Sequence, residues 1–246
     1  MKVYFLGTNG WYDTETGNTI CTLVDTKSCY ILLDAGNGIH KIDKYIKEDK
    51  PVHLFLSHFH LDHIIGLHIL LKFKFKSLSI YGQPGTKKIL NNFLSKKFSA
   101  PFSMLPCSHK IIEVNEGWHN NPMEFQCLKL KHSSPCIGYR FKIENKIINY
   151  CVDTGYCDNA VELSKNADIL ISECSFASGQ VNPAWPHLNP ELATKLAKDA
   201  KAKKLVLTHF DANVYKTMKQ RSGSEKIAKK IFEKTVAATD GKMINI

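Results

Sequence analysis

Short apolar runs, broken by glycine or polar residues, open the chain. Runs rich in β-branched and aromatic residues occupy positions 3–6, 19–25, 29–33 and 52–56. Runs of this length between turn residues predict strands. The first three lie close enough in sequence to form a meander.

Four further segments have the apolar periodicity of helices. Apolar side chains recur every three or four residues at 64–72, 86–93, 190–200 and 225–234. Pro190 suits the first turn of the third helix, because the N–H that proline lacks is not needed there.

Strand signals continue in the second half of the chain. Alternation across 138–152, around a turn at 144–146, predicts a hairpin whose strands are joined directly. Apolar runs at 169–171 and 204–208 predict two more strands. No internal repeat, low-complexity tract or Pro/Gly/Ser-rich linker divides the chain, so we expect one domain, residues 1–246, of sheets flanked by helices.

Composition narrows the class of protein. The chain has 246 residues, and 43% of them are hydrophobic, which suits a globular core. No segment approaches the ~20 consecutive apolar residues of a membrane span, and residues 1–8 hold only a short apolar run, so we expect a cytoplasmic protein without membrane contact. The eight cysteines form no C-x-x-C pair, so we expect buried, reduced thiols.

The chain is basic, with a formal net charge of +10 at pH 7. A basic surface suits a polyanionic partner such as nucleic acid. Arg140 and Arg221 are the only arginines, so the excess is almost all lysine and equally fits a general lysine bias. Charge alone therefore leaves nucleic-acid binding open.

A dense group of metal-ligand residues follows the fourth predicted strand. His58, His60, Asp62 and His63 stand within six positions. Side chains alternate along an extended segment, so His58 and His60 can hold one ion, while the next turn brings Asp62 and His63 to a second. Imidazole and carboxylate groups suit Zn²⁺, and two ions about 3.5 to 4 Å apart can hold a hydroxide between them.

The H-x-H-x-D-H motif resembles the signature of the metallo-β-lactamase superfamily, and the resemblance extends over nearly the whole chain. It implies an α/β fold, the four-layer αββα sandwich, and three later ligands at His132, Asp153 and His209. By this resemblance one metal has the ligands His58, His60, His132 and Asp153. The second has Asp62, His63, His209 and the bridging Asp153. The implied cofactors are two divalent ions, with zinc expected and manganese or iron open.

Several segments are similar to the ribonuclease Z branch of that superfamily. They lie at 5–8, 32–38, 172–176, 187–190 and 204–210. The similarity implies that His187 is a general acid rather than a ligand and that Asp62 is a ligand and a candidate base. It also implies that Asp34 and Glu173 are carboxylates that orient ligand imidazoles.

Two departures from ribonuclease Z change the expected substrate. That family grips tRNA with a long arm, in many members inserted between the equivalents of His132 and Asp153. Here 153 − 132 = 21 positions separate these residues, and the predicted hairpin fills most of them. Gly17-Asn18 also replaces a common Arg-Asn pair. We therefore expect a phosphodiesterase that acts on a small phosphodiester or nucleotide rather than on tRNA.

Two other functions remain open. A lactam or thioester hydrolase would use the same metals, although Asp153 stands where many zinc β-lactamases have cysteine, and Phe210 departs from glyoxalase II. An RNA-binding relative without activity is disfavoured by the complete ligand set. A homodimer is expected by analogy with relatives.

Overall fold

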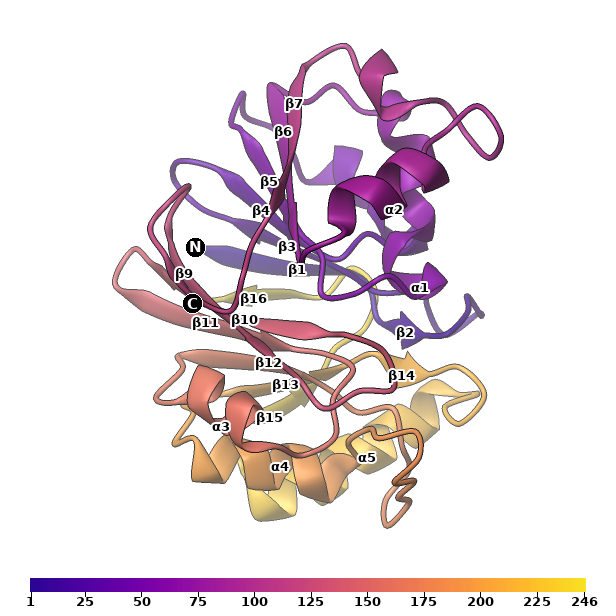
Figure 1. Ribbon diagram of the computed structural model, residues 1–246. Helices are drawn as coiled ribbons and strands as arrows, with labels where there is room; N and C mark the ends of the chain where they lie inside the picture. Colours follow the sequence, from indigo (N-terminus) through magenta and orange to yellow (C-terminus); the bar gives the residue numbers. More distant parts are fainter.

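The computed structural model describes all 246 residues and contains two mixed sheets of seven strands each. The sheets lie face to face, and helices cover both outer faces (Figure 1). This arrangement confirms the four-layer αββα sandwich that the sequence predicts.

The strands of each sheet come largely from one half of the chain. The first sheet contains, in spatial order, β16 (Met243–Asn245), β1 (Lys2–Gly7), β3 (Cys21–Asp25), β4 (Tyr30–Leu33), β5 (Val52–Phe55), β6 (Ser77–Gly82) and β7 (Ser108–Glu113). The second contains β15 (Thr235–Ala237), β13 (Leu205–Thr208), β12 (Ile169–Glu173), β11 (Lys146–Cys151), β10 (Ile137–Ile143), β9 (Glu124–Lys129) and β8 (Gly117–His119). Two short strands, β2 (Asn9–Gly10) and β14 (Phe210–Asp211), pair with each other.

Helices form the two outer layers. The α-helices are α1 (Leu61–Ile64), α2 (Thr86–Phe93), α3 (Asp158–Ser164), α4 (Pro190–Asp199) and α5 (Met218–Ile231). Three 3₁₀ helices span Asn37–Lys44, Ile65–Lys72 and Phe102–Met104. No helix has the length and apolar character needed to cross a bilayer. All eight cysteines are free thiols; six are buried as expected, whereas Cys107 and Cys157 are partly exposed.

Three apolar clusters hold the layers together. Between the sheets, the ring of Phe55 on β5 meets Phe125 of β9 and Phe141 of β10 edge-on, at centroid distances of 5.1 and 4.8 Å. The two outer clusters bury the helices against their own sheets. Because close-packed cores resist deformation, the edges of the two sheets are held in fixed relative positions.

Most predicted elements are confirmed. β1, β3 and β4 are antiparallel neighbours, as expected for a meander. The predicted hairpin is β10 and β11, and its turn residues Glu144 and Asn145 have φ of 51° and 61°, typical of a type I′ turn. Helix α2 has its predicted bounds, and α4 ends one residue early.

The predicted helix at 64–72 is wrong in type, because residues 65–72 form a 3₁₀ helix. In an α-helix the amide of Gly66 would donate to the carbonyl of Asp62, but here it donates to Ala35. The carbonyl of His63 likewise accepts from Ala35 rather than from the next turn. The Gly66 amide and the His63 carbonyl thus bond the loop after β4 instead of forming the internal hydrogen bonds of an α-helix.

The last helix begins seven residues before its predicted start at 225 and ends at Ile231. A capping box fixes this start: Thr217 Oγ1 accepts from the Gln220 amide, and the Gln220 side chain accepts from the Thr217 amide. The apolar pattern also does not predict α3 or β6 to β9. Strands β7 and β8 lie at sheet edges and contain no fully buried residue, which weakens the apolar signal.

Parallel strands carry polar residues to one edge of the sandwich. β4 and β5 run parallel in the first sheet, as do β11, β12 and β13 in the second. The carboxyl ends of parallel strands meet at one sheet edge, a common location for ligand sites. The residues at or just after these ends are Asp34, 58–63, Asp153, Glu173 and His209.

Candidate metal centre

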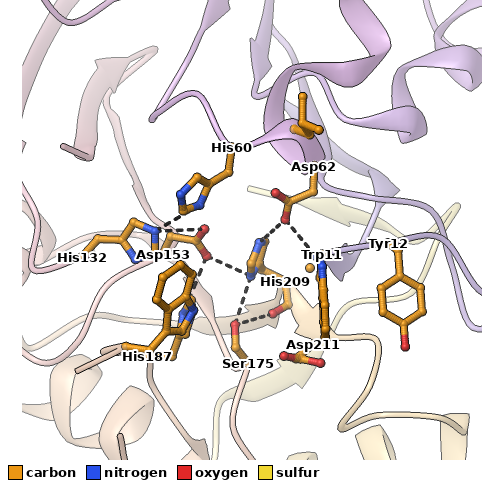
Figure 2. A pocket seen from close by; sticks show the side chains of 13 residues that line it. Trp11, Tyr12, His60, Asp62, His132, Asp153, Ser175, His187, His209 and Asp211 are labelled. Carbon is orange, nitrogen blue, oxygen red and sulfur yellow. Dashed lines mark hydrogen bonds and ion pairs between the residues drawn. The ribbon is translucent and has the colours of Figure 1, made fainter. Parts of the chain in front are cut away.

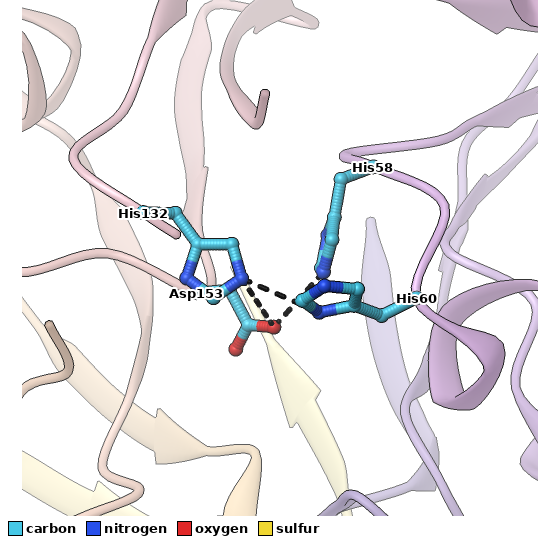
Figure 3. A group of neighbouring side chains, drawn as sticks. All are labelled: His58, His60, His132 and Asp153. Atoms are coloured by element: carbon cyan, nitrogen blue, oxygen red, sulfur yellow. Dashed lines mark hydrogen bonds and ion pairs between the residues drawn. The ribbon is translucent and has the colours of Figure 1, made fainter. Parts of the chain in front are cut away.

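The first group of donors joins the loop after β5 to the second sheet. His58, His60, His132 and Asp153 place one ligand atom each within 4.8 Å of all the others (Figure 3). His58 Nε2 lies 3.2 Å from Asp153 Oδ2, and His132 Nε2 lies 3.3 Å from His60 Nδ1. The structure therefore assembles the four residues that the resemblance assigns to one metal.

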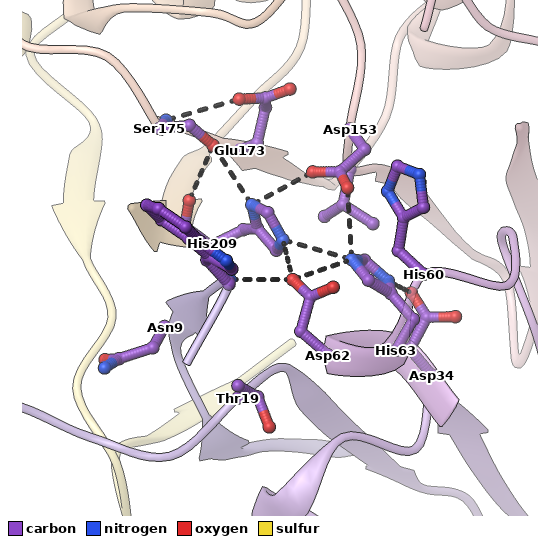
Figure 4. Close-up of polar contacts among 12 residues, drawn as sticks. Asn9, Thr19, Asp34, His60, Asp62, His63, Asp153, Glu173, Ser175 and His209 are labelled. Carbon is purple, nitrogen blue, oxygen red and sulfur yellow. Dashed lines mark hydrogen bonds and ion pairs between the residues drawn. The ribbon is translucent and has the colours of Figure 1, made fainter. Parts of the chain in front are cut away.

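The second group contains Asp62, His63 and His209, whose donor atoms also lie within 4.8 Å of one another (Figure 4). His63 Nε2 is 3.0 Å from His209 Nε2, which is 3.2 Å from Asp62 Oδ2. Asp153 joins this group to the first, because its oxygens lie 3.1 Å from His63 Nε2 and 3.0 Å from His209 Nδ1.

The arrangement of these ligand atoms suits a bound cation better than it suits hydrogen bonds between the side chains. His58 Nε2 and Asp153 Oδ1 are buried and make no hydrogen bond of good geometry, although other donors lie close by. Unpartnered buried polar atoms are costly, so atoms that converge without pairing indicate a ligand site. Nitrogen and carboxylate oxygen donors in this number suit a transition metal such as zinc.

The protonation of the cluster supports the same conclusion. Burial by itself would lower the pKa of His63, but the carboxylates Asp34, Asp62 and Asp153 outweigh it and raise that pKa to about 10. Burial would raise the pKa of Asp153, but His209 and His63 hold it well below its usual value. These buried carboxylates need positive charge, which protons or metal cations can supply.

Two further carboxylates orient rings of the site. Asp34 Oδ2 lies 2.7 Å from His63 Nδ1, and Asp34 also accepts from the hydroxyls of Ser57 and Tyr150. This leaves His63 Nε2 to face the donor cluster. Glu173 differs from the expectation in its contact, because it bonds Nδ1 of His187 at 2.8 Å rather than a ring of either donor group.

The structure adds three residues that the sequence analysis did not assign. Ser175 Oγ lies 3.0 Å from His209 Nδ1, the Trp11 amide donates to Asp62 Oδ2 at 2.8 Å, and Gly10 packs on the His209 ring. Ser175 belongs to the segment 172–176, whose similarity to ribonuclease Z could have indicated it. The contact of Trp11 depends on backbone geometry, which no side-chain pattern reveals.

A cavity of about 680 Å³ opens over both groups (Figure 2). None of its lining residues is a lysine or an arginine, although the chain has 33 such residues. The lining residues are Gly10, Trp11, Tyr12, His60, Leu61, Asp62, His132, Asp153, Ser175, Trp185, His187, His209 and Asp211.

Residues 30–210 match the family model described as the beta-lactamase superfamily domain. The chain belongs to this superfamily. Ribonuclease Z of Prochlorococcus marinus strain MIT 9301 is 27% identical, with 98% of each chain covered. The Bacillus subtilis protein named "Probable metallo-hydrolase YhfI" is also 27% identical, with 85% of this chain and 87% of the relative covered.

Solved structures share the fold. The crystal structure of YhfI, a metallo-beta-lactamase fold protein, has a TM-score of 0.82 at 26% identity and covers 99% of this chain and 98% of its own. Human tRNase Z, short form, has a TM-score of 0.76 at 21% identity and covers 100% of this chain and 99% of its own. The superfamily relation and the names of these relatives identify the chain as an enzyme of the metallo-β-lactamase hydrolase family, with a His/Asp cluster that could bind metal ions.

Gly10→Ala tests whether the ring of His209 must stay in its observed position. A Cβ at Gly10 would lie 2.5 Å from His209 Cε1, and three polar contacts oppose movement of that ring. We expect lower metal content and a roughly 10- to 100-fold loss of hydrolytic activity, because small displacements of reacting groups are costly. Elemental analysis and turnover measure both effects.

Gly223→Ala is the matched control, because a Cβ at Gly223 in helix α5 would meet no atom within 4 Å. Alanine is about 0.5 to 1 kcal/mol better than glycine inside a helix, so this variant should be fully active and slightly more stable. Native metal content and activity in Gly10→Ala would contradict the need for a fixed His209.

Proposed function

We propose that the protein is a dinuclear zinc-dependent phosphodiesterase that acts on a small phosphodiester or nucleotide. The observation that carries this proposal is the Asp153 carboxylate, which lies between two groups of donors and approaches both. One carboxylate shared by two sites brings two cations close together, the arrangement that phosphoryl-transfer enzymes use. The relatives named ribonuclease Z support the phosphodiester class.

The proposed ligands follow the two donor groups. His58, His60 and His132 would hold one ion, Asp62, His63 and His209 the other, and Asp153 both. Bound divalent ions supply Lewis acidity toward water and toward the phosphate oxygens. His63 and His209 lie against carboxylates that raise their pKa values, so the ions would displace protons when they bind.

Asp62 suits a ligand role better than a proton-accepting role. Burial would raise its pKa, but His63 and His209 outweigh burial and hold it below the usual value. A weakly basic carboxylate stays anionic and binds cations. The 2.8 Å hydrogen bond from the Trp11 amide to Oδ2 fixes its orientation.

The surroundings of His187 support its assignment as the proton donor to the leaving group. Glu173 bonds its Nδ1, so Nε2 is the ring nitrogen without a hydrogen bond to the protein, on a side chain that lines the cavity. Burial would lower the pKa of His187, but Glu173 and Asp153 outweigh it and raise that pKa above the ordinary value. A raised pKa favours the protonated ring, the form that a general acid requires.

The segment between His132 and Asp153 supports a small substrate. It consists mainly of β10 and β11, which pair within the second sheet, so it forms no protruding arm. The alignment with ribonuclease Z of Prochlorococcus extends over 305 positions against the 246 residues of this chain, so at least 59 positions belong to the relative alone. The alignment with YhfI, by contrast, extends over only 220 positions, fewer than the 246 residues of this chain.

A panel of substrates tests the proposed reaction. We expect the zinc-loaded protein to hydrolyse bis-p-nitrophenyl phosphate, and to process precursor tRNA far more slowly because it has no arm for the tRNA elbow. Nitrocefin and lactoylglutathione should remain intact. Preferred turnover of either of these two would instead indicate a lactam or thioester hydrolase, and site-specific removal of a tRNA 3′ trailer would refute the small-substrate assignment. Salt-sensitive RNA binding without any turnover would favour a non-enzymatic relative.

Asp153→Ala and Asp62→Ala test the shared ligand. We expect about two ions per native chain, and a larger loss of metal and activity in Asp153→Ala, because this change weakens both sites and Asp62→Ala weakens one. Both rates should fall by orders of magnitude. Asp43→Ala is the control, since its carboxylate pairs with Lys72 on the surface. Full activity in Asp153→Ala would show that the ligand is misassigned.

His187→Ala separates proton donation from metal binding. The variant should keep its metal and lose roughly 100-fold or more in rate for esters with poor leaving groups. The loss should shrink for p-nitrophenolate esters, which need no proton to depart. His68→Ala, at an exposed histidine outside the cavity, is the control. Equal losses for both ester types would exclude the acid role, and loss of metal would make His187 a ligand.

A further inference from the structure

Large apolar side chains are exposed around the mouth of the cavity. Trp11 is 65% exposed, Leu61 62%, Trp185 48% and Tyr12 41%, and all four line the cavity. Two of the three tryptophans of the chain are therefore here. Exposed apolar groups that gather at one place mark a binding surface rather than a random distribution.

Trp11 is held at the cavity in an unfavourable backbone conformation. Its φ of 73° lies in the left-handed region, which bulky residues rarely adopt. Its amide donates to Asp62 Oδ2, and its ring meets Tyr12 edge-on at a centroid distance of 5.2 Å (Figure 2). Strain of this kind persists only where the surroundings impose it, and it is concentrated at functional sites.

A buried hydrogen-bond network fixes the loop that carries Trp11 and Tyr12. Arg221 is 1% exposed and donates to Thr8 Oγ1 at 2.9 Å and to Asn9 Oδ1. The Asn9 side chain in turn donates to the carbonyl of Tyr12 at 3.1 Å. The pairing of β2 with β14 connects the same loop to the strand that follows His209. The aromatic pair is thus prepositioned, which reduces the entropy lost when a ligand binds.

Trp185 lies at the other donor group. Its ring is parallel to His60, with an interplanar angle of 5° and a centroid distance of 5.9 Å, and its centroid is 6.5 Å from that of His187. If His187 protonates the leaving group, Trp185 lies on the leaving-group side. Trp11, whose amide bonds Asp62 Oδ2, and the adjoining Tyr12 line the cavity at the second donor group, so they are then available to the part of the substrate that is retained on the phosphate.

The charge of the cavity limits the phosphate content of a ligand. No lysine or arginine lines it, and Asp211 adds a further carboxylate. Additional phosphates would therefore find no cationic side chain, in contrast to sites that bind polyphosphates. A single phosphodiester with a planar group attached suits this combination of rings and charge.

We propose that Trp11 and Tyr12 form an aromatic platform for a planar group, such as a nucleobase, on the retained side of a singly charged phosphodiester. Because the two rings meet edge-on, one ring stacks on the planar group and the other contacts its edge. This inference rests on the proposed phosphodiesterase activity. Aromatic side chains bind bases through their faces without base-specific hydrogen bonds, so the platform accepts more than one base.

Two esters with the same leaving group test the platform. Thymidine 5′-(p-nitrophenyl phosphate) and methyl p-nitrophenyl phosphate differ only in the retained group. Trp11→Ala and Tyr12→Ala should each raise KM for the thymidine ester by up to about tenfold, because each removes one of the two aromatic contacts to the base. KM for the methyl ester should change much less, so the ratio of the two KM values reports the platform, and Trp11→Phe should retain much of the affinity.

Trp118→Ala is the matched control, because Trp118 is 48% exposed and lies outside the cavity. If the native protein hydrolyses both esters but the variants change neither KM, the platform is refuted and the phosphodiesterase remains. Absence of turnover of both esters would refute the proposed activity instead.

Calorimetry with thymidine 5′-phosphate and deoxyribose 5-phosphate measures the platform without turnover. Tighter binding of the base-bearing compound, lost in Trp11→Ala, would support the platform. Equal binding of the two compounds would refute it.

Discussion

The buried carboxylate of Asp153 is the contact on which the whole site depends. Its oxygens lie between 3.0 and 3.2 Å from ring nitrogens of His58, His63 and His209, which come from both sheets. A buried carboxylate costs several kcal/mol unless positive charge compensates it. The loops after β5, β11 and β13 must therefore bring compensating groups to one point, and the packed sheets hold them there. The two donor groups are not independent, because any change at Asp153 alters both.

This convergence is accompanied by backbone strain. Asp34, Asp153 and His209 each follow a strand closely and have φ of 57°, 54° and 49°, in the region that residues other than glycine seldom occupy. Trp11 adds a fourth such residue. Each conformation costs on the order of 1 kcal/mol or more, and the apolar burial of three clusters offsets it. The stability of the sandwich thus makes the geometry of the site possible.

The sequence predicts those parts of the structure that local pattern determines. The spacing of His58, His60, Asp62 and His63 indicated a metal site. The hairpin turn, predicted at 144–146 and observed at 144–145, and the bounds of α2 followed from local signals. The type of the helix at 65–72 did not, because its amides and carbonyls bond Ala35 from another part of the chain. The contacts of Trp11 and Gly10 with the site likewise depend on how distant segments pack. Tertiary contacts, which a pattern in one segment does not encode, account for these differences.

The distribution of charge connects the fold to the proposed substrate. The two arginines are both buried and hold backbone or loop groups in place, with Arg140 bonding the carbonyls of Leu163 and Lys165 and Arg221 bonding Asn9. The many lysines lie outside the cavity. Their charge can attract an anion at long range, but it provides no contact at the site itself, and salt screens it beyond roughly 10 Å. Recognition close to the proposed metals must therefore come from the cations, His187 and the aromatic rings, a combination that suits one phosphodiester with one planar group better than a long polyanion.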